Sequence, residues 1–164
     1  MDNPSKPAVL TAVPADAVAI RQIAIAANID SWSESDYLAE IERRDSFVLK
    51  AVVDGEIGGF LLARTVPGSS EGSDIDLYNI AVRPENSRRG LGTALMAELL
   101  NRIDSANIEN IWLEVRESNT EAIKFYEKHR FSAELTRPRF YSNPVENAVI
   151  MRLKLVPKEK VNSV

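Results

Sequence analysis

The stretch Tyr78-Asn79-Ile80-Ala81-Val82-Arg83-Pro84-Glu85-Asn86-Ser87-Arg88-Arg89-Gly90-Leu91-Gly92-Thr93 joins an apolar strand to an amphipathic helix through a polar turn. Gly90 and Gly92 leave the neighbouring backbone amides unshielded, because glycine has no Cβ atom. The helix that begins there adds unpaired N–H groups and about half a positive charge at its N-terminus. With Arg88 and Arg89 beside them, these groups predict a binding site for a phosphate group. A tight strand-to-helix turn would use the same glycines, so the pattern alone leaves both interpretations open.

The elements around this stretch follow from hydrophobic periodicity and from local turn and cap signals. Asp54-Gly55 between two apolar runs predicts a β-hairpin. Ser33 with Asp36 three residues later predicts a helix start, as does the capping box Ser118-x-x-Glu121. Strands are expected over residues 8–13, 46–53, 57–66, 75–82, 111–115, 131–139 and 148–155, and helices over residues 14–27, from 33, 91–107 and 118–129.

This order predicts a single α/β domain with a mixed central sheet and the sequence β-α-α-β-β-β-α-β-α-β-β. The domain is expected to occupy residues 1–155, with residues 156–164 as a flexible tail. The strand over residues 75–82 is nearly apolar at its end, which predicts burial on both of its faces.

Composition and charge narrow the class of protein. The chain has 164 residues, of which 45% are hydrophobic and 27% charged, as is typical of a soluble globular domain. A net charge of −4 and a pI near 5.2 argue against nucleic-acid binding. The absence of cysteine and the single histidine exclude disulfides, a thiol nucleophile and a multi-histidine metal site. No signal pattern or membrane-spanning segment is visible. We therefore expect a cytoplasmic protein, monomeric or weakly dimeric, without a metal.

Several motifs resemble those of the GNAT family of N-acetyltransferases, and they are most similar to its ribosomal-protein-alanine branch. The glycine loop resembles the family's acyl-CoA diphosphate loop, although Ser87 stands where the family has arginine or glutamine. The run Trp112-Leu113-Glu114-Val115-Arg116, followed at the family's spacing by Asn119 and Tyr126, is the more specific match. The resemblance covers nearly the whole chain, with further matching segments at residues 32–34, 80–82, 90–92, 122–123, 126–127 and 148–151.

Acetyl transfer to an amine requires a group that takes a proton from the amine and one that protonates the thiolate leaving group. Glu114 lies among apolar neighbours, and partial desolvation would raise the pKa of its carboxyl group. A salt bridge to Arg116 or Arg139 is the structural alternative. The resemblance implies that Glu114 is the catalytic base, acting directly or through a water. It also implies that Tyr126, which would otherwise be a core aromatic residue, is the general acid.

The resemblance implies acetyl-CoA as the co-substrate. It further implies that backbone amides around Ile80 and Val82 polarise the thioester carbonyl, where their strand parts from the strand over residues 111–115. The residues implied to bind acetyl-CoA are Ile80, Ala81, Val82, Arg88, Arg89, Gly90, Leu91, Gly92, Thr93, Asn119 and Tyr126, and those implied to bind the acceptor are Trp32, Ser33, Glu34 and Tyr141.

Most of these residues also have an ordinary structural interpretation. Asn119 is a suitable helix cap, Trp32 a suitable core anchor, and Arg88 and Arg89 are typical solvated loop charges. His129 is expected to be an exposed helix-end residue.

Three positions depart from the family in ways that bear on stability or acceptor choice. Arg130 stands where the family has a helix-ending glycine, and a left-handed backbone there would cost about 1 kcal/mol. Ser142 and Asn147 stand where the branch usually has tyrosine and aspartate, at positions implied to border the acceptor.

The leading functional hypothesis is direct acetyl transfer from acetyl-CoA to a protein N-terminal α-amine, such as that of a ribosomal protein. Without cysteine, a covalent acetyl-cysteine intermediate is excluded. The same chemistry on a small amine, such as a polyamine, an amino acid or an antibiotic, is the first alternative. A non-catalytic acyl-CoA-binding module is the second.

Overall fold

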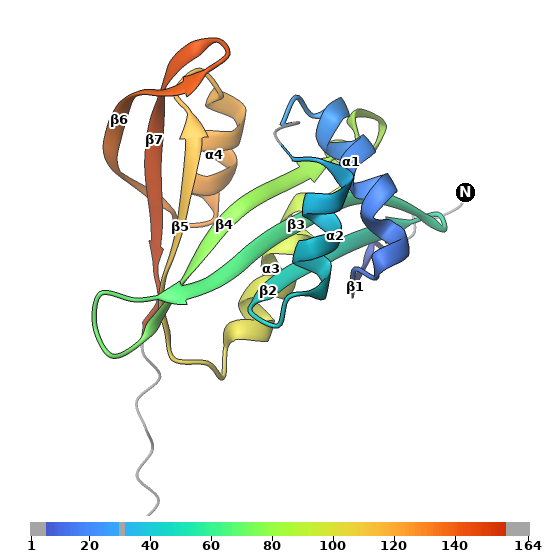
Figure 1. Ribbon diagram of the computed structural model, residues 1–164, viewed down its shortest axis with the longest axis horizontal. Coiled ribbons are helices and arrows are strands. Elements are labelled where there is room, and N and C mark those ends of the chain that lie inside the picture. Colours follow the sequence, from blue (N-terminus) through green and yellow to red (C-terminus); the bar gives the residue numbers. More distant parts are fainter. Residues whose placement is uncertain (1–5, 30–31, 157–164) are drawn as a thin grey trace, which may run out of the picture. The chain divides into compact units, whose positions relative to one another are not determined.

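The computed structural model describes residues 6–29 and 32–156, so the predicted tail lies outside the described residues except for Val156. Its elements have the predicted order (Figure 1). They are β1 (Ala8–Thr11), α1 (Ala17–Ala26), α2 (Glu34–Glu42), β2 (Ser46–Val53), β3 (Glu56–Pro67), β4 (Ser73–Val82), α3 (Leu91–Ile103), β5 (Ile108–Arg116), α4 (Thr120–Lys128), β6 (Ser132–Ser142) and β7 (Val145–Lys154), with short 3-10 turns at Pro14–Asp16 and Pro84–Asn86.

The strands form a seven-stranded sheet in the order β1-β2-β3-β4-β5-β7-β6. β4 and β5 are parallel, whereas β1–β2, β2–β3, β5–β7 and β6–β7 are antiparallel, which confirms the predicted mixed sheet. Among the described residues, no helix is long and apolar enough to cross a bilayer.

The described residues group into two compact units. The first holds the residues up to Arg64 together with Leu77–Ser105, and the second holds Thr65–Asp76 and the residues from Ala106 onward. The predicted site residues divide between them. The glycine loop and Trp32 belong to the first unit, and Glu114 belongs to the second.

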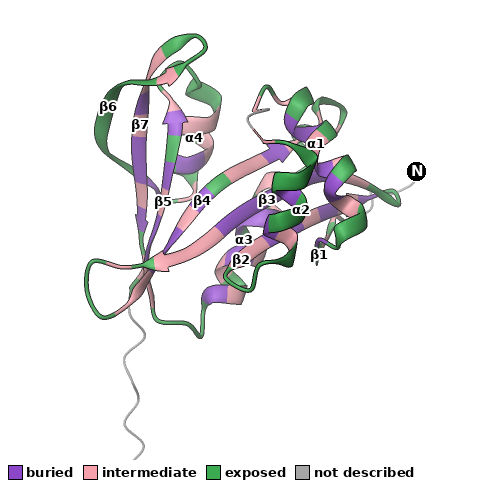
Figure 2. Ribbon diagram, in the orientation of Figure 1, coloured by how far each residue is buried: buried purple, intermediate pink, exposed green. Residues whose placement is uncertain are grey.

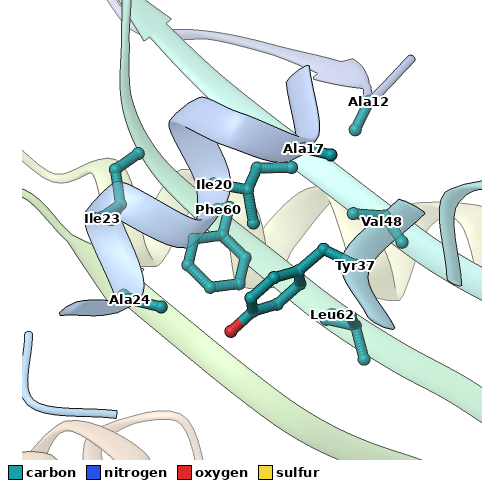
Figure 3. Packing of buried hydrophobic residues seen from close by; sticks show 10 residues of the cluster. Ala12, Ala17, Ile20, Ile23, Ala24, Tyr37, Val48, Phe60 and Leu62 are labelled. Carbon is teal, nitrogen blue, oxygen red and sulfur yellow. The ribbon is translucent and has the colours of Figure 1, made fainter. Parts of the chain in front are cut away.

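In the first unit, helices lie on both faces of the β2–β3 hairpin, with α1 and α2 on one face and α3 on the other (Figure 1). The α1–α2 side is a cluster of buried side chains in which the Tyr37 and Phe60 rings pack in a T-shaped arrangement, with ring centroids 5.6 Å apart (Figure 3). α3 buries the stripe of Leu91, Leu95 and Leu99, spaced at the helical period.

Two local predictions in this unit are confirmed. Asp54 and Gly55 both have positive φ, at 53° and 82°, as a two-residue type I′ hairpin requires. Ser33 is the N-cap of α2. Its hydroxyl accepts a hydrogen bond from the Asp36 amide at 3.2 Å, while the Asp36 carboxylate accepts one from the Ser33 amide at 2.7 Å.

In the second unit, β7 lies between β5 and β6. β5 alternates as predicted, because Ile111, Leu113 and Val115 are buried whereas Trp112 and Glu114 are more exposed. β6 is exposed over nearly its whole length, while much of β7 beside it is buried (Figure 2).

Three sequence-based expectations are wrong in detail. Burial of the end of β4 on both faces is wrong, since Tyr78 is 37% exposed. The described pairing of β4 with β5 ends at Asp76. The Ser118 capping box is wrong, because the N-cap of α4 is Asn119. The last two strands are longer than predicted and leave only residues 143–144 as the turn, so Tyr141 and Glu146 lie within strands.

Candidate functional site

The glycine loop of the first unit has the features of an anion site. Gly90 is the N-cap of α3 with φ +77°, and a Cβ atom there would meet no atom within 4 Å. The first helical hydrogen bond runs from the Ala94 amide to the Gly90 carbonyl at 2.9 Å. The amides of Leu91, Gly92 and Thr93 therefore lie in the first turn, where the helix itself supplies no acceptor. Open space in front of such amides fits a diphosphate.

The two arginines before the loop differ in what they contact. Arg89 donates to the Asp54 carboxylate and to the Asn86 side-chain carbonyl, each at 3.1 Å, so its guanidinium is held in place. Arg88 is exposed with φ +61°, and within residues 6–29 and 32–156 its guanidinium has no hydrogen-bond or ion-pair partner. Of the two cations, Arg88 is the one available to an anionic ligand.

The predicted acceptor residues of the first unit lie at the start of α2. The Trp32 ring is half-buried, with centroids 5.6 Å from the Tyr37 ring and 5.7 Å from the Tyr78 ring. Trp32 is thus anchored on the core, as its structural interpretation predicted, and its neighbour Tyr78 presents a partly exposed ring. The Ser33 side chain is engaged in capping, whereas Glu34 is exposed.

Glu114 lies on β5 in the second unit, where its side chain is 41% exposed. Its ionic partner is Arg137 of β6, with 3.8 Å between Nη1 and Oε1. The predicted partners, Arg116 and Arg139, are wrong. Arg116 pairs instead with Glu146 at 3.1 Å, and Arg139 lies in an irregular part of β6, with φ +51°.

The electrostatic surroundings of Glu114 suit a base. Desolvation is the largest effect and raises the pKa of its carboxyl group, the Arg137 guanidinium opposes this by lowering the pKa, and the Asp76 carboxylate raises it further. The net result is a raised pKa, as expected from its apolar neighbours. A carboxylate of this kind is poised to accept a proton closer to neutral pH than an ordinary glutamate.

Tyr126 is on α4 in the same unit and is 8% exposed. Its ring packs against Phe125 and Phe131, with centroid distances of 5.5 and 5.6 Å. Burial is the main cause that raises the pKa of its hydroxyl well above the ordinary value, and Tyr141 adds to it. The hydroxyl carries its proton at neutral pH, as that of an ordinary tyrosine also does. Both the core role and the acid role are compatible with this position.

Asn119 caps α4, with its Oδ1 atom accepting from the Ala122 amide at 3.2 Å. Its structural interpretation is therefore confirmed, while its implied contact with the co-substrate stays a prediction.

Reasoning from the sequence considered Arg116 only as a salt-bridge partner of Glu114. Arg116 lies over the Tyr141 ring, with 4.1 Å between its guanidinium carbon and the ring centroid. Its place two residues after Glu114, on the same face of β5, was the available signal.

Comparisons with known proteins show which family this chain is similar to. Residues 17–131 match the model of the acetyltransferase (GNAT) family. The [ribosomal protein bS18]-alanine N-acetyltransferase of Salmonella typhimurium is 32% identical over 142 residues, which cover 85% of this chain and 92% of that protein. An N-alpha-acetyltransferase of Sulfurisphaera tokodaii is 30% identical over 146 residues, covering 84% and 85%. The crystal structure of the ribosomal-protein-S18-alanine N-acetyltransferase from Escherichia coli has a TM-score of 0.81 at 27% identity, covering 94% and 98%.

The chain belongs to the GNAT family of acetyltransferases. It is thus an acyltransferase, as the glycine loop and the run around Glu114 predicted.

Proposed function

We propose that this enzyme transfers the acetyl group of acetyl-CoA to the α-amine of a protein's N-terminal residue. The observation that carries the chemistry is that one compact unit contains both a carboxylate of raised pKa, Glu114, and a buried tyrosine, Tyr126. The similarity to two N-terminal acetyltransferases, over most of their length, supports the choice of acceptor.

The reaction is one displacement at the thioester carbonyl. Glu114 takes a proton from the acceptor's ammonium group, directly or through a water, and the free amine attacks the carbonyl carbon. The new C–N bond forms as the C–S bond breaks, and Tyr126 gives its proton to the departing thiolate. The second proton that the attacking nitrogen loses as it becomes an amide restores the tyrosine hydroxyl. The chain has no cysteine that could form a covalent acetyl intermediate.

Acetyl-CoA is the co-substrate, and the first turn of α3 fits its diphosphate. The amides after Gly90 and the available guanidinium of Arg88 supply donors and positive charge. The backbone around Ile80 and Val82 is the proposed source of donors to the thioester carbonyl.

An α-amine suits this base better than a lysine side chain does. The ammonium group of an α-amine has a pKa of about 7.7–8.0, against about 10.4 for lysine. A carboxylate with a modestly raised pKa can therefore deprotonate the α-amine near neutral pH. We propose small first residues such as alanine or serine, at the N-terminus of a protein such as a ribosomal protein.

The test is a pair of matched peptides incubated with acetyl-CoA. One has a free N-terminus and an internal lysine, and the other is the same peptide with its N-terminus blocked. Fragmentation mass spectrometry locates the acetyl group, and a thiol-release assay reports turnover. We expect labelling of the free N-terminus alone. Equal labelling of the blocked peptide, or thiol release with polyamines only, would replace the proposed acceptor by lysine or by a small amine.

A further inference from the structure

Arg116, the last residue of β5, connects three parts of the second unit through one side chain. Its Nη1 donates to the Glu146 carboxylate at 3.1 Å and to the Pro144 carbonyl at 3.3 Å, and its Nη2 donates to the Asn143 carbonyl at 3.3 Å. The flat face of the same guanidinium covers the Tyr141 ring at 4.1 Å. Only a planar group with several donors can make such a set of contacts, and lysine cannot reproduce it.

These contacts of Arg116 form a clamp on the end of the β6–β7 hairpin. The β6–β7 register is interrupted between Arg137 and Tyr141, and pairing resumes only for Tyr141 with Glu146 and Ser142 with Val145. Side chains add further contacts on both sides of this short paired end. The Asn147 Oδ1 atom accepts from the Arg139 amide at 3.0 Å, and Glu146 accepts from the Ser118 amide at 2.6 Å.

The clamp also connects the hairpin end to the proposed base. Glu114 and Arg116 are two residues apart on one strand and therefore point to the same face. Burial raises the pKa of Tyr141, and the charge of Glu114 raises it further. The contact of Arg116 with the Tyr141 ring therefore bears on where that ring lies relative to Glu114.

We propose that Arg116 is a positioning residue for the acceptor, which holds Tyr141 and the β6–β7 turn beside Glu114. This inference rests on the proposed function, in which Tyr141 borders the acceptor. Arg116 takes no part in proton transfer itself. Its loss is expected to weaken acceptor binding and to leave the affinity for acetyl-CoA unchanged.

The chain offers a matched control for this inference. Arg152 of β7 also pairs with a carboxylate, Glu134, at 2.8 Å and also lies over an aromatic ring, that of Trp112, at 5.2 Å. Arg152→Lys therefore removes the same kinds of contact from the same unit without touching Tyr141 or the turn.

The experiment compares the parent, Arg116→Lys and Arg152→Lys by steady-state kinetics with each substrate varied in turn. We expect Arg116→Lys to raise the KM for the acceptor about tenfold, because the fork of hydrogen bonds to Glu146 and the turn carbonyls and the contact with the Tyr141 ring are lost. The KM for acetyl-CoA should stay within twofold of the parent. Arg152→Lys is expected to leave both KM values within twofold. Three outcomes would each overturn the inference. Arg116→Lys could raise both KM values equally, or it could leave the acceptor KM unchanged. The third outcome is that Arg152→Lys raises the acceptor KM as much as Arg116→Lys does.

Two further measurements separate this inference from the proposed function and from loss of folding. Hydrogen exchange of residues 141–147 is measured without substrate, and faster exchange in Arg116→Lys than in Arg152→Lys supports the clamp. Unchanged exchange overturns it whatever the acceptor is. If the parent acetylates a polyamine and not a peptide, the proposed acceptor fails, and the KM comparison is made with the polyamine. Tyr141→Phe, which keeps the ring, should retain most of the acceptor affinity that Tyr141→Ala loses.

Discussion

Arg130 carries a strained backbone at the end of α4, directly after the helix that bears Tyr126. Its φ is +68°, in the left-handed region. The Arg130 amide donates to the Glu127 carbonyl at 2.9 Å, and the Phe131 amide donates to the Tyr126 carbonyl at 3.0 Å. These two bonds define a Schellman motif, and the Tyr126–Phe131 ring contact at 5.6 Å is its usual apolar companion. The motif normally places glycine at the position of Arg130.

The expected gain of Arg130→Gly over Arg130→Ala follows from two opposing terms. A left-handed conformation costs a residue with a Cβ atom about 1–2 kcal/mol. This gain is reduced by about 0.4–1 kcal/mol, because an unfolded chain with glycine at this position has more conformational entropy to lose on folding. The net stabilisation is about 0.5–1 kcal/mol, which for a domain of this size raises Tm by about 1–4 °C.

Thermal and urea unfolding of the parent, Arg130→Ala and Arg130→Gly test this expectation. Both variants remove the arginine charge, whose interaction with the helix C-terminus contributes about 0.3–1 kcal/mol. The comparison of glycine with alanine therefore isolates the Cβ atom. The strain argument is refuted if the glycine variant is no more stable than the alanine variant. Turnover should be the same in both, since the motif that supports Tyr126 is retained.

Three further predictions concern the site. Gly90→Val places a branched side chain in the open space before α3 and should abolish acetyl-CoA binding, as measured by calorimetric titration. Circular dichroism should show that the variant is folded, and undiminished affinity would contradict the anion site. Tyr126→Phe should lower kcat by about 10²-fold with unchanged acetyl-CoA affinity, and a rate within a few-fold of the parent would leave Tyr126 as a core residue only. Arg137→Gln removes the cation that lowers the pKa of Glu114, so the acidic limb of the kcat/KM profile should move to higher pH; an unmoved limb would show that Glu114 is not the titrating base.

The order of elements could be predicted because each depends on a local signal. Asp54-Gly55 specifies its turn through two positive φ angles, and Ser33 specifies a helix start through its own side chain. Ser118 fails as a cap for an equally physical reason. Asn119, one residue later, supplies the capping oxygen, while the Ser118 amide is taken by Glu146 from a distant strand. When two consecutive residues can both cap a helix, long-range contacts determine which of them does so.

The arginine that pairs with Glu114 could not be predicted from the sequence. Arg137 and Arg139 are two residues apart and would share one face of a regular strand, so strand periodicity cannot distinguish them. The irregularity after Arg137 decides between them, since Arg139 has φ +51° and its amide is held by Asn147. Such irregularities depend on cross-strand contacts that no local pattern encodes. The family motif therefore identifies the proposed base, whereas the cation that tunes its pKa is set by a break in strand pairing.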